Sequence, residues 1–121
     1  MQKKDVYSSI PNSRFNQYRV MWNLVFFDLP VTSPADQKAA TKFRDNLLKD
    51  GFQMFQFSIY VRHSVSREGA DLHKRRVKSF LPKRGKVGIL QITDKQFGMI
   101  EIFEGTKQEE VKAPPQQLEI F

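Results

Sequence analysis

Residues 18–28 read YRVMWNLVFFD, and this stretch decides the fold. Apolar or aromatic side chains occupy most of its positions, on both of the alternating faces that an extended strand presents. Strands that are apolar on both faces are typical of the centre of a sheet, where structure covers each side. We therefore expect residues 18–28 to form a central strand.

A helix is predicted directly after this strand. Ser33 can cap it, Pro34 suits its first position, and Asp36 favours the positive end of the helix dipole. A stripe with a spacing of four follows, formed by Ala35, Ala39, Phe43 and Leu47. The pair Asp50 and Gly51 then ends the helix, because glycine readily takes the left-handed capping conformation.

The rest of the chain alternates between shorter elements. We expect a second strand at 52–62, a helix at about 67–81, short strands at 86–93 and 99–103 around a turn at 94–98, a polar linker at 105–115 and a short terminal strand at 118–121. The order is then β-α-β-β or β-α-β-α-β-β, depending on how the middle pieces pair. Either order gives an α+β sandwich.

Charge is concentrated in the middle of this 121-residue chain, which carries a net charge of +7. Residues 62–86 hold nine Lys and Arg against Glu68 and Asp71, a net of +7, whereas residues 101–121 have an acidic excess. A localised basic surface of this kind indicates a polyanionic partner.

Several classes of site and protein are excluded by composition. The chain has no Cys, which excludes disulfide scaffolds, zinc sites with Cys ligands and thiol nucleophiles, and it has only two His. Its longest apolar run, residues 24–27, is far shorter than the roughly 20 residues that cross a bilayer. We expect a cytoplasmic protein with no membrane partner.

The predicted second helix carries the strongest candidate binding surface. Lys74, Arg75 and Lys78 lie close together on it, at spacings that allow one face to contact phosphates without reading bases. The candidate nucleic-acid-binding residues are Lys38, Lys42, Arg62, Lys74, Arg75, Arg76, Lys78, Lys83 and Arg84. The alternative is a merely solvated amphipathic helix.

Asp28 is the candidate catalytic residue and metal ligand, because it ends the most apolar strand of the chain. Mg²⁺ prefers oxygen ligands and often uses one or two protein carboxylates, so a two-fold dimer that paired two copies of Asp28 would complete a site. The alternative is an Asx-type turn before Pro30. Helix capping accounts for Asp36, a solvated helix face for Asp45 and Asp50, and a turn for Asp94.

The aromatic residues could stack bases, but their alternation within strands favours a core. This set is Tyr18, Trp22, Phe26, Phe55, Phe57 and Tyr60. We interpret His63 as a loop residue and His73 as a residue on a helix surface.

Taken together, the motifs resemble the family of CRISPR-associated protein 2, the small subunit of the spacer-acquisition complex. The similarity is carried by Tyr18 to Met21 running into Phe26-Phe27-Asp28-Leu29-Pro30, then Lys42-Phe43-Arg44, Leu47-Leu48, Gly51-Phe52, Gln56-Phe57-Ser58-Ile59-Tyr60 and Thr93-Asp94-Lys95-Gln96-Phe97. It spans residues 18–103 and is greatest toward members that accompany effectors of the Cas-nine type.

The resemblance implies a ferredoxin-like β-α-β-β-α-β fold over residues 18–104. Residues 1–17 are then a loose N-terminal extension, and residues 105–121 are a linker and an additional C-terminal strand that joins a partner's sheet. The resemblance also implies a homodimer formed by sheet faces, which bridges dimers of the CRISPR integrase and supports captured double-stranded DNA.

Some members of this family are Mg²⁺-dependent endonucleases, which use the aspartate that Asp28 matches in each protomer. The resemblance therefore leaves three functions open. They are a DNA-binding scaffold, a metal-dependent nuclease and, less favoured, a toxin-like ribonuclease.

Overall fold

The computed structural model describes residues 20–110 of the chain. Its elements are β1 (Met21–Asp28), α3 (Pro34–Lys49), β2 (Gln53–Gln56), β3 (Ile59–Ser64), α4 (Arg67–Ser79), β4 (Lys86–Thr93), α5 (Asp94–Gly98), β5 (Ile102–Glu104) and β6 (Lys107–Glu109). The predicted extension at 1–17 and the predicted strand at 118–121 lie outside the described residues, so the proposed division of the chain into domains stays a prediction.

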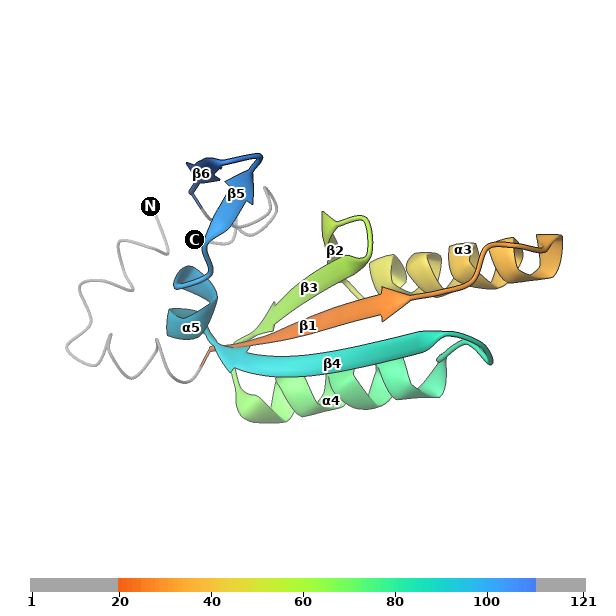
Figure 1. The fold of residues 1–121 in the computed structure, drawn as a ribbon. Helices are drawn as coiled ribbons and strands as arrows, with labels where there is room; N and C mark the ends of the chain where they lie inside the picture. The colour runs from red at the N-terminus through yellow and green to blue at the C-terminus, as the bar shows by residue number, and fades with distance from the viewer. Residues whose placement is uncertain (1–19, 111–121) are drawn as a thin grey trace.

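Four strands form an antiparallel sheet in the order β2-β3-β1-β4, with β1 between β3 and β4. Helices α3 and α4 cover one face of this sheet (Figure 1). The order β-α-β-β-α-β with this strand arrangement is the ferredoxin-like fold that the resemblance implied. The prediction of a central strand within residues 18–28 is confirmed by the position of β1.

The helix-covered face holds a closed core. Val25 and Phe27 of β1 pack against Phe43 and Leu47 of α3 and against Val77 of α4, and each of these side chains is at most 7% exposed. The rings of Phe27 and Phe43 meet edge to face, with their centroids 5.2 Å apart. One apolar stripe from each helix is therefore enough to cover this side of β1.

Helix α3 begins as predicted but is rotated from the predicted stripe. The Ser33 hydroxyl accepts a hydrogen bond from the Asp36 N–H at 3.0 Å, and Pro34 takes the first helical position. Ala40, Phe43 and Leu47 are buried, whereas Ala35 and Ala39 are exposed. A strict spacing of four drifts around a helix that repeats every 3.6 residues, so the early part of the predicted stripe leaves the core.

The opposite face of the sheet, which we call the open face, is covered at one end. There Trp22 stacks on Phe97 of α5 with ring centroids 3.9 Å apart, and its indole N–H donates to the Asp94 carboxylate at 2.7 Å. Further along the same face, Phe26 and Leu90 remain 48% and 50% exposed.

Gly88 makes room for the exposed Phe26 ring. Phe26 pairs with Gly88 across β1 and β4, and a Cβ at position 88 would lie 2.3 Å from the Phe26 ring. A side chain larger than that of glycine at position 88 would therefore have to displace the Phe26 ring.

Four of the shorter predicted segments differ from the structure. The strand expected at 52–62 is a hairpin, because β2 ends at Gln56 and β3 starts at Ile59. The expected turn at 94–98 is helix α5, closed by a capping box between Thr93 and Gln96. Part of the expected linker is strand β6, which pairs with β5, and β5 itself starts three residues later than predicted. Within residues 20–110 no helix is long and apolar enough to cross a membrane.

Candidate nucleic-acid interface

Asp28 is the last residue of β1, and its side chain is exposed. It lies opposite Lys86 in the pairing of β1 with β4. Because side chains alternate along a strand, Asp28 points to the open face together with Trp22 and Phe26. Gly85 packs closely beside it, since a Cβ there would lie 2.8 Å from the Asp28 carbonyl oxygen.

One protomer does not supply a complete metal site at this position. Residues 20–110 contain no group of three or more His, Cys, Asp or Glu side chains that could hold a metal ion. The carboxylate of Asp28 is a suitable oxygen ligand for Mg²⁺, which often takes one or two protein carboxylates and completes its shell with water. The metal role of Asp28, alone or paired with its copy in a second protomer, stays a prediction.

Helix α4 presents the candidate basic residues as predicted. Its buried side carries Ala70, His73 and Val77, which leaves Arg75 and Lys78 exposed and Lys74 half-buried. We call Lys74, Arg75 and Lys78 the α4 basic face. These three side chains form no ion pair with any other residue of the range 20–110.

Arg76, by contrast, already has a carboxylate partner. Its guanidinium donates to Asp50 at 3.0 Å, and the same carboxylate is 2.8 Å from the His73 ring nitrogen Nδ1. The Asp50 side chain is 8% exposed and His73 is 7% exposed. The interpretations of Asp50 as a solvated acid and of His73 as a surface residue are therefore wrong, because the two side chains join the end of α3 to α4.

Arg62 lies beside this cluster on β3 and serves the fold as well. Its guanidinium reaches the Gly51 carbonyl oxygen at 3.3 Å. Burial lowers the pKa of Arg62 from its ordinary value, and the nearby Arg76 adds to this effect while Asp50 opposes it. A half-buried cation engaged with the backbone is a weaker candidate for phosphate binding than the α4 basic face.

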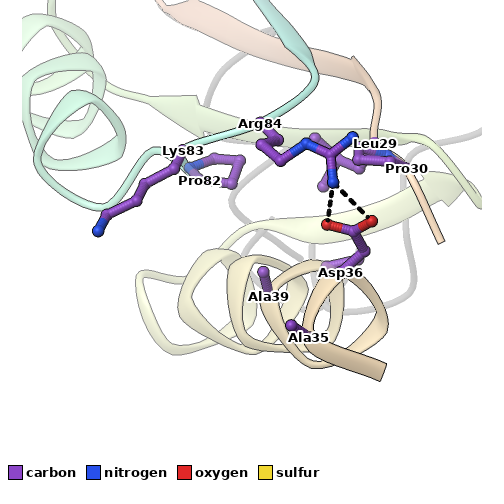
Figure 2. A pocket seen from close by; sticks show the side chains of 9 residues that line it. Leu29, Pro30, Ala35, Asp36, Ala39, Pro82, Lys83 and Arg84 are labelled. Atoms are coloured by element: carbon purple, nitrogen blue, oxygen red, sulfur yellow. Dashed lines mark hydrogen bonds and ion pairs between the residues drawn. The ribbon is translucent and has the colours of Figure 1, made fainter. Parts of the chain in front are cut away.

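Arg84 and Asp36 form a second long-range pair (Figure 2). Both Asp36 oxygens lie 2.9 Å from Nη1 of Arg84, and Thr32 donates to the same carboxylate at 3.3 Å. Asp36 is 7% exposed, so it does more than favour the helix dipole: it holds the loop after α4 against the start of α3. Lys83 extends away from this pair (Figure 2).

Helix α3 contributes Lys38 and Lys42, both exposed. Together with Lys49 they line a shallow groove along the outer side of α3. Since α3 and α4 cover the same face of the sheet, these lysines and the α4 basic face belong to one helical layer (Figure 1). Asp28 points to the opposite face, so the structure does not bring the candidate catalytic residue and the basic helices together.

The aromatic residues divide between the core and the surface. Trp22 and Tyr60 are buried as predicted, whereas Phe26 and Phe57 are exposed, and Tyr18 lies outside the described residues. His63 belongs to strand β3 rather than to a loop, and its ring lies 5.4 Å from that of Trp22.

Sequence reasoning missed one charged residue, Arg44 on α3. Its guanidinium lies over two aromatic rings, 4.1 Å from the centre of Phe57 and 5.4 Å from that of Phe27. The three residues are distant in sequence, so no local spacing signals the contact.

The chain is similar to known proteins along most of its length. Residues 21–100 match the sequence model of the family "CRISPR associated protein Cas2". Three relatives carry the name "CRISPR-associated endoribonuclease Cas2". The protein from Flavobacterium psychrophilum is 56% identical over 90% of this chain and 95% of its own length. The one from Parvibaculum lavamentivorans is 44% identical over 84% and 100%, and the one from Paracidovorax avenae is 46% identical over 86% and 96%. The chain therefore belongs to the Cas2 family of CRISPR-associated proteins.

Proposed function

We propose that this Cas2-family protein is a dimeric scaffold for spacer acquisition, which binds captured double-stranded DNA and bridges dimers of the CRISPR integrase. The α4 basic face is the observation that carries the proposal. Lys74, Arg75 and Lys78 have no carboxylate partner among residues 20–110. Their charge is therefore available to DNA phosphates, and each phosphate contact releases condensed counterions.

The ion pairs refine which cations belong to this surface. A phosphate would have to compete with Asp50 for Arg76 and with Asp36 for Arg84. We therefore assign DNA binding first to the α4 basic face and to Lys38 and Lys42. Lys83 is a further contact, and Arg62, Arg76 and Arg84 have structural roles.

The first experiment neutralises the α4 basic face in one variant, Lys74→Gln/Arg75→Gln/Lys78→Gln. Affinity for a labelled blunt DNA duplex is measured by fluorescence anisotropy over a range of salt concentrations. We expect weaker binding and a salt slope reduced by up to about 3, since each phosphate contact adds about 0.9 to the slope. Lys107→Gln, an exposed lysine on β6, is the control and should leave the slope nearly unchanged. An unchanged slope in the triple variant contradicts the proposal.

We assign the dimer contact to the open face. Phe26 and Leu90 are about half exposed there, and burying apolar surface is worth about 25 cal/mol per Å². The hairpin of β5 and β6 also supports an intermolecular contact, because an isolated two-stranded hairpin is marginally stable in water.

The bridging role is tested with the integrase encoded at the same locus. We expect the two proteins to co-purify and to integrate spacers together, and Asp28→Ala should keep full activity if the protein acts only as a scaffold. Failure to co-purify would overturn the bridging role.

A second candidate function is a metal-dependent endoribonuclease, favoured by the name that the relatives carry and by the exposed carboxylate at the end of β1. Asp28 and its copy in a second protomer would hold Mg²⁺ between them, and such an ion activates water and stabilises negative charge on a phosphodiester. The dimer would add a second carboxylate to the site, since residues 20–110 of one protomer contain no group of three or more such ligands.

Cleavage of labelled single-stranded RNA in the presence of Mg²⁺ tests this second candidate. Asp28→Asn should abolish cleavage without changing the oligomeric state. Asp45→Asn, which removes an exposed carboxylate on α3, should cleave like the unmodified protein. Persistent cleavage by purified Asp28→Asn excludes a catalytic role for Asp28.

A further inference from the structure

Phe57 is one of the most exposed aromatic residues in the described chain, at 70% exposure. It lies in the turn between β2 and β3, and one face of its ring is covered by the Arg44 guanidinium at 4.1 Å. The rest of the ring is largely open to solvent, since the residue is 70% exposed. A ring that is held against a cation on one side and is otherwise exposed is available to stack on a ligand.

The turn that carries Phe57 is fixed to the sheet. The Phe27 N–H donates to the Ser58 carbonyl oxygen at 3.0 Å, so the turn is bonded to the last residues of β1. The Arg44 guanidinium also lies 5.4 Å from the buried Phe27 ring, which anchors the stack to the core. The position of Phe57 is therefore set before any ligand arrives, which lowers the entropic cost of binding.

Arg44 keeps unused hydrogen-bonding capacity. Its side chain forms no hydrogen bond or ion pair with another residue of the range 20–110, and its Nε is buried without a partner. Nη1 and Nη2 are not among the buried unpaired atoms. A guanidinium stacked on a ring presents its donors in the plane of the group, in the fork that suits a phosphate.

We propose that Arg44 and Phe57 form a binding site for an unpaired nucleotide, whose base stacks on the free face of Phe57 and whose phosphate accepts hydrogen bonds from Arg44. This inference rests on the proposed function in one respect, that the ligand of the protein is a nucleic acid. The base must be unpaired, because the faces of bases within a duplex are already stacked on their neighbours. Stacking on aromatic side chains is the common means of holding single strands without sequence preference.

The site and Asp28 flank the end of β1 from opposite sides. Phe27 points to the helix-covered face and contacts Arg44, whereas Asp28, the next residue, points to the open face. A single strand that passes around the end of β1 would therefore meet the stacking site on one side and the candidate carboxylate on the other.

The experiment compares binding of three labelled oligonucleotides of one sequence: single-stranded RNA, single-stranded DNA and the blunt DNA duplex. We expect Phe57→Ala to weaken binding of the single strands by roughly five- to 160-fold, which is the range seen when a stacking residue is removed. Phe57→Trp should restore it, and duplex binding should change less than about two-fold. Val65→Ala, which truncates a 77% exposed apolar side chain near the other end of β1, is the control and should leave single-strand binding unchanged.

Arg44 is tested through the salt dependence of the same measurement. Arg44→Gln should reduce the salt slope for single strands by about 0.7, the value of one phosphate contact. Arg44→Lys keeps the charge but loses the planar fork, so it should keep the slope and weaken binding.

Each outcome decides between the inference and the function on which it rests. Unchanged single-strand binding by Phe57→Ala overturns the site, even if the loss of duplex binding in the triple variant of the α4 basic face supports the scaffold function. A changed oligomeric state in Phe57→Ala also overturns it, because the ring would then cover a partner chain. A loss with both single strands supports a site that reads base and phosphate, and a loss with RNA alone supports one that also reads the 2′-hydroxyl. If the triple variant of the α4 basic face binds duplex DNA normally, the scaffold function fails. A loss of single-strand binding in Phe57→Ala would still support the nucleotide site.

Discussion

The two faces of the sheet are both apolar, but the chain completes only one of them. On the helix-covered face, Val25 and Phe27 are at most 7% exposed beneath α3 and α4. On the open face, Trp22 is buried by Phe97, whereas Phe26 is 48% exposed on the same strand. One face of β1 therefore lies in a closed core, and its other face is partly exposed.

This difference shows what an apolar strand pattern specifies. The pattern of residues 18–28 required cover on both faces, and it did not say whether the cover comes from the same chain. Over residues 20–110 the chain supplies two helices for one face and the short helix α5 for one end of the other. The uncovered remainder is where we place a second protomer.

The largest effect on the free energy of unfolding is expected from a substitution in the closed core beneath α3 and α4. Phe43→Ala should lower the free energy of unfolding by about 3–5 kcal/mol, because it removes a ring that is 1% exposed and leaves a cavity between α3 and β1. Urea denaturation followed by circular dichroism measures the loss. Thr41→Ala, at an exposed position of the same helix, should stay within about 0.5 kcal/mol of the unmodified protein. Equal losses in the two variants would contradict the assignment of the core.

An intermediate effect is expected where α5 closes the end of the open face. Asp94→Ala leaves the buried Trp22 indole N–H without its acceptor, so unfolding should become about 1–3 kcal/mol easier. Asp94→Asn keeps an oxygen acceptor and should lose less. The fluorescence of Trp22, the single tryptophan of the chain, reports the same contact during denaturation. If both variants lose equally, the hydrogen bond is not the source of the effect.

Substitutions on the exposed part of the open face should change the stability of the protomer only slightly. One of them should specifically weaken dimer formation. Leu90 on β4 and Leu48 on α3 are 50% and 51% exposed, so Leu90→Glu and Leu48→Glu form a matched pair on opposite faces. Both should change the stability of the protomer by only about 0.5 kcal/mol, as exposed substitutions do. Leu90→Glu alone should shift the protein toward monomer, because a dimer on the open face would bury the new charge. Sedimentation equilibrium measures the shift, and a dimer that persists in Leu90→Glu excludes this face.

The elements predicted well from sequence carry strong local signals. The bounds of β4 match the prediction, and α3 starts at its predicted cap on Ser33. The hairpin of β2 and β3 was missed because its turn at Phe57 and Ser58 contains no Gly or Pro, and the alternation of side chains continues through it. Its register also shifts between Met54 and Gln56, which no periodic pattern reveals.

The candidate site also has features that local sequence predicts and features that it does not. The exposed position of Arg75 and Lys78 follows from helical spacing, which is a local property. Helical spacing does not reveal the partners of the other arginines. Arg84 and Asp36 are 48 residues apart in sequence, and Arg76 and Asp50 are 26 apart. Counting charges along the chain therefore located the basic region but could not separate free cations from paired ones.

The smallest effect is expected in the pH dependence of stability, which reports whether water reaches Tyr60 on the helix-covered face. Tyr60 is 3% exposed and packs near Phe27. Burial raises the pKa of the Tyr60 hydroxyl above its ordinary value of 10.0, Asp45 adds to this shift, and Arg44 opposes it. Once the pH passes 10, the unfolded chain loses this proton while the folded chain keeps it, so the stability of the protein falls as pH rises toward the folded pKa. Tyr60→Phe removes that contribution and should flatten the fall, as measured by urea midpoints between about pH 9 and 11. The same slope in both proteins would mean that water reaches the hydroxyl, and the helix-covered face would then be less closed than its neighbouring side chains indicate.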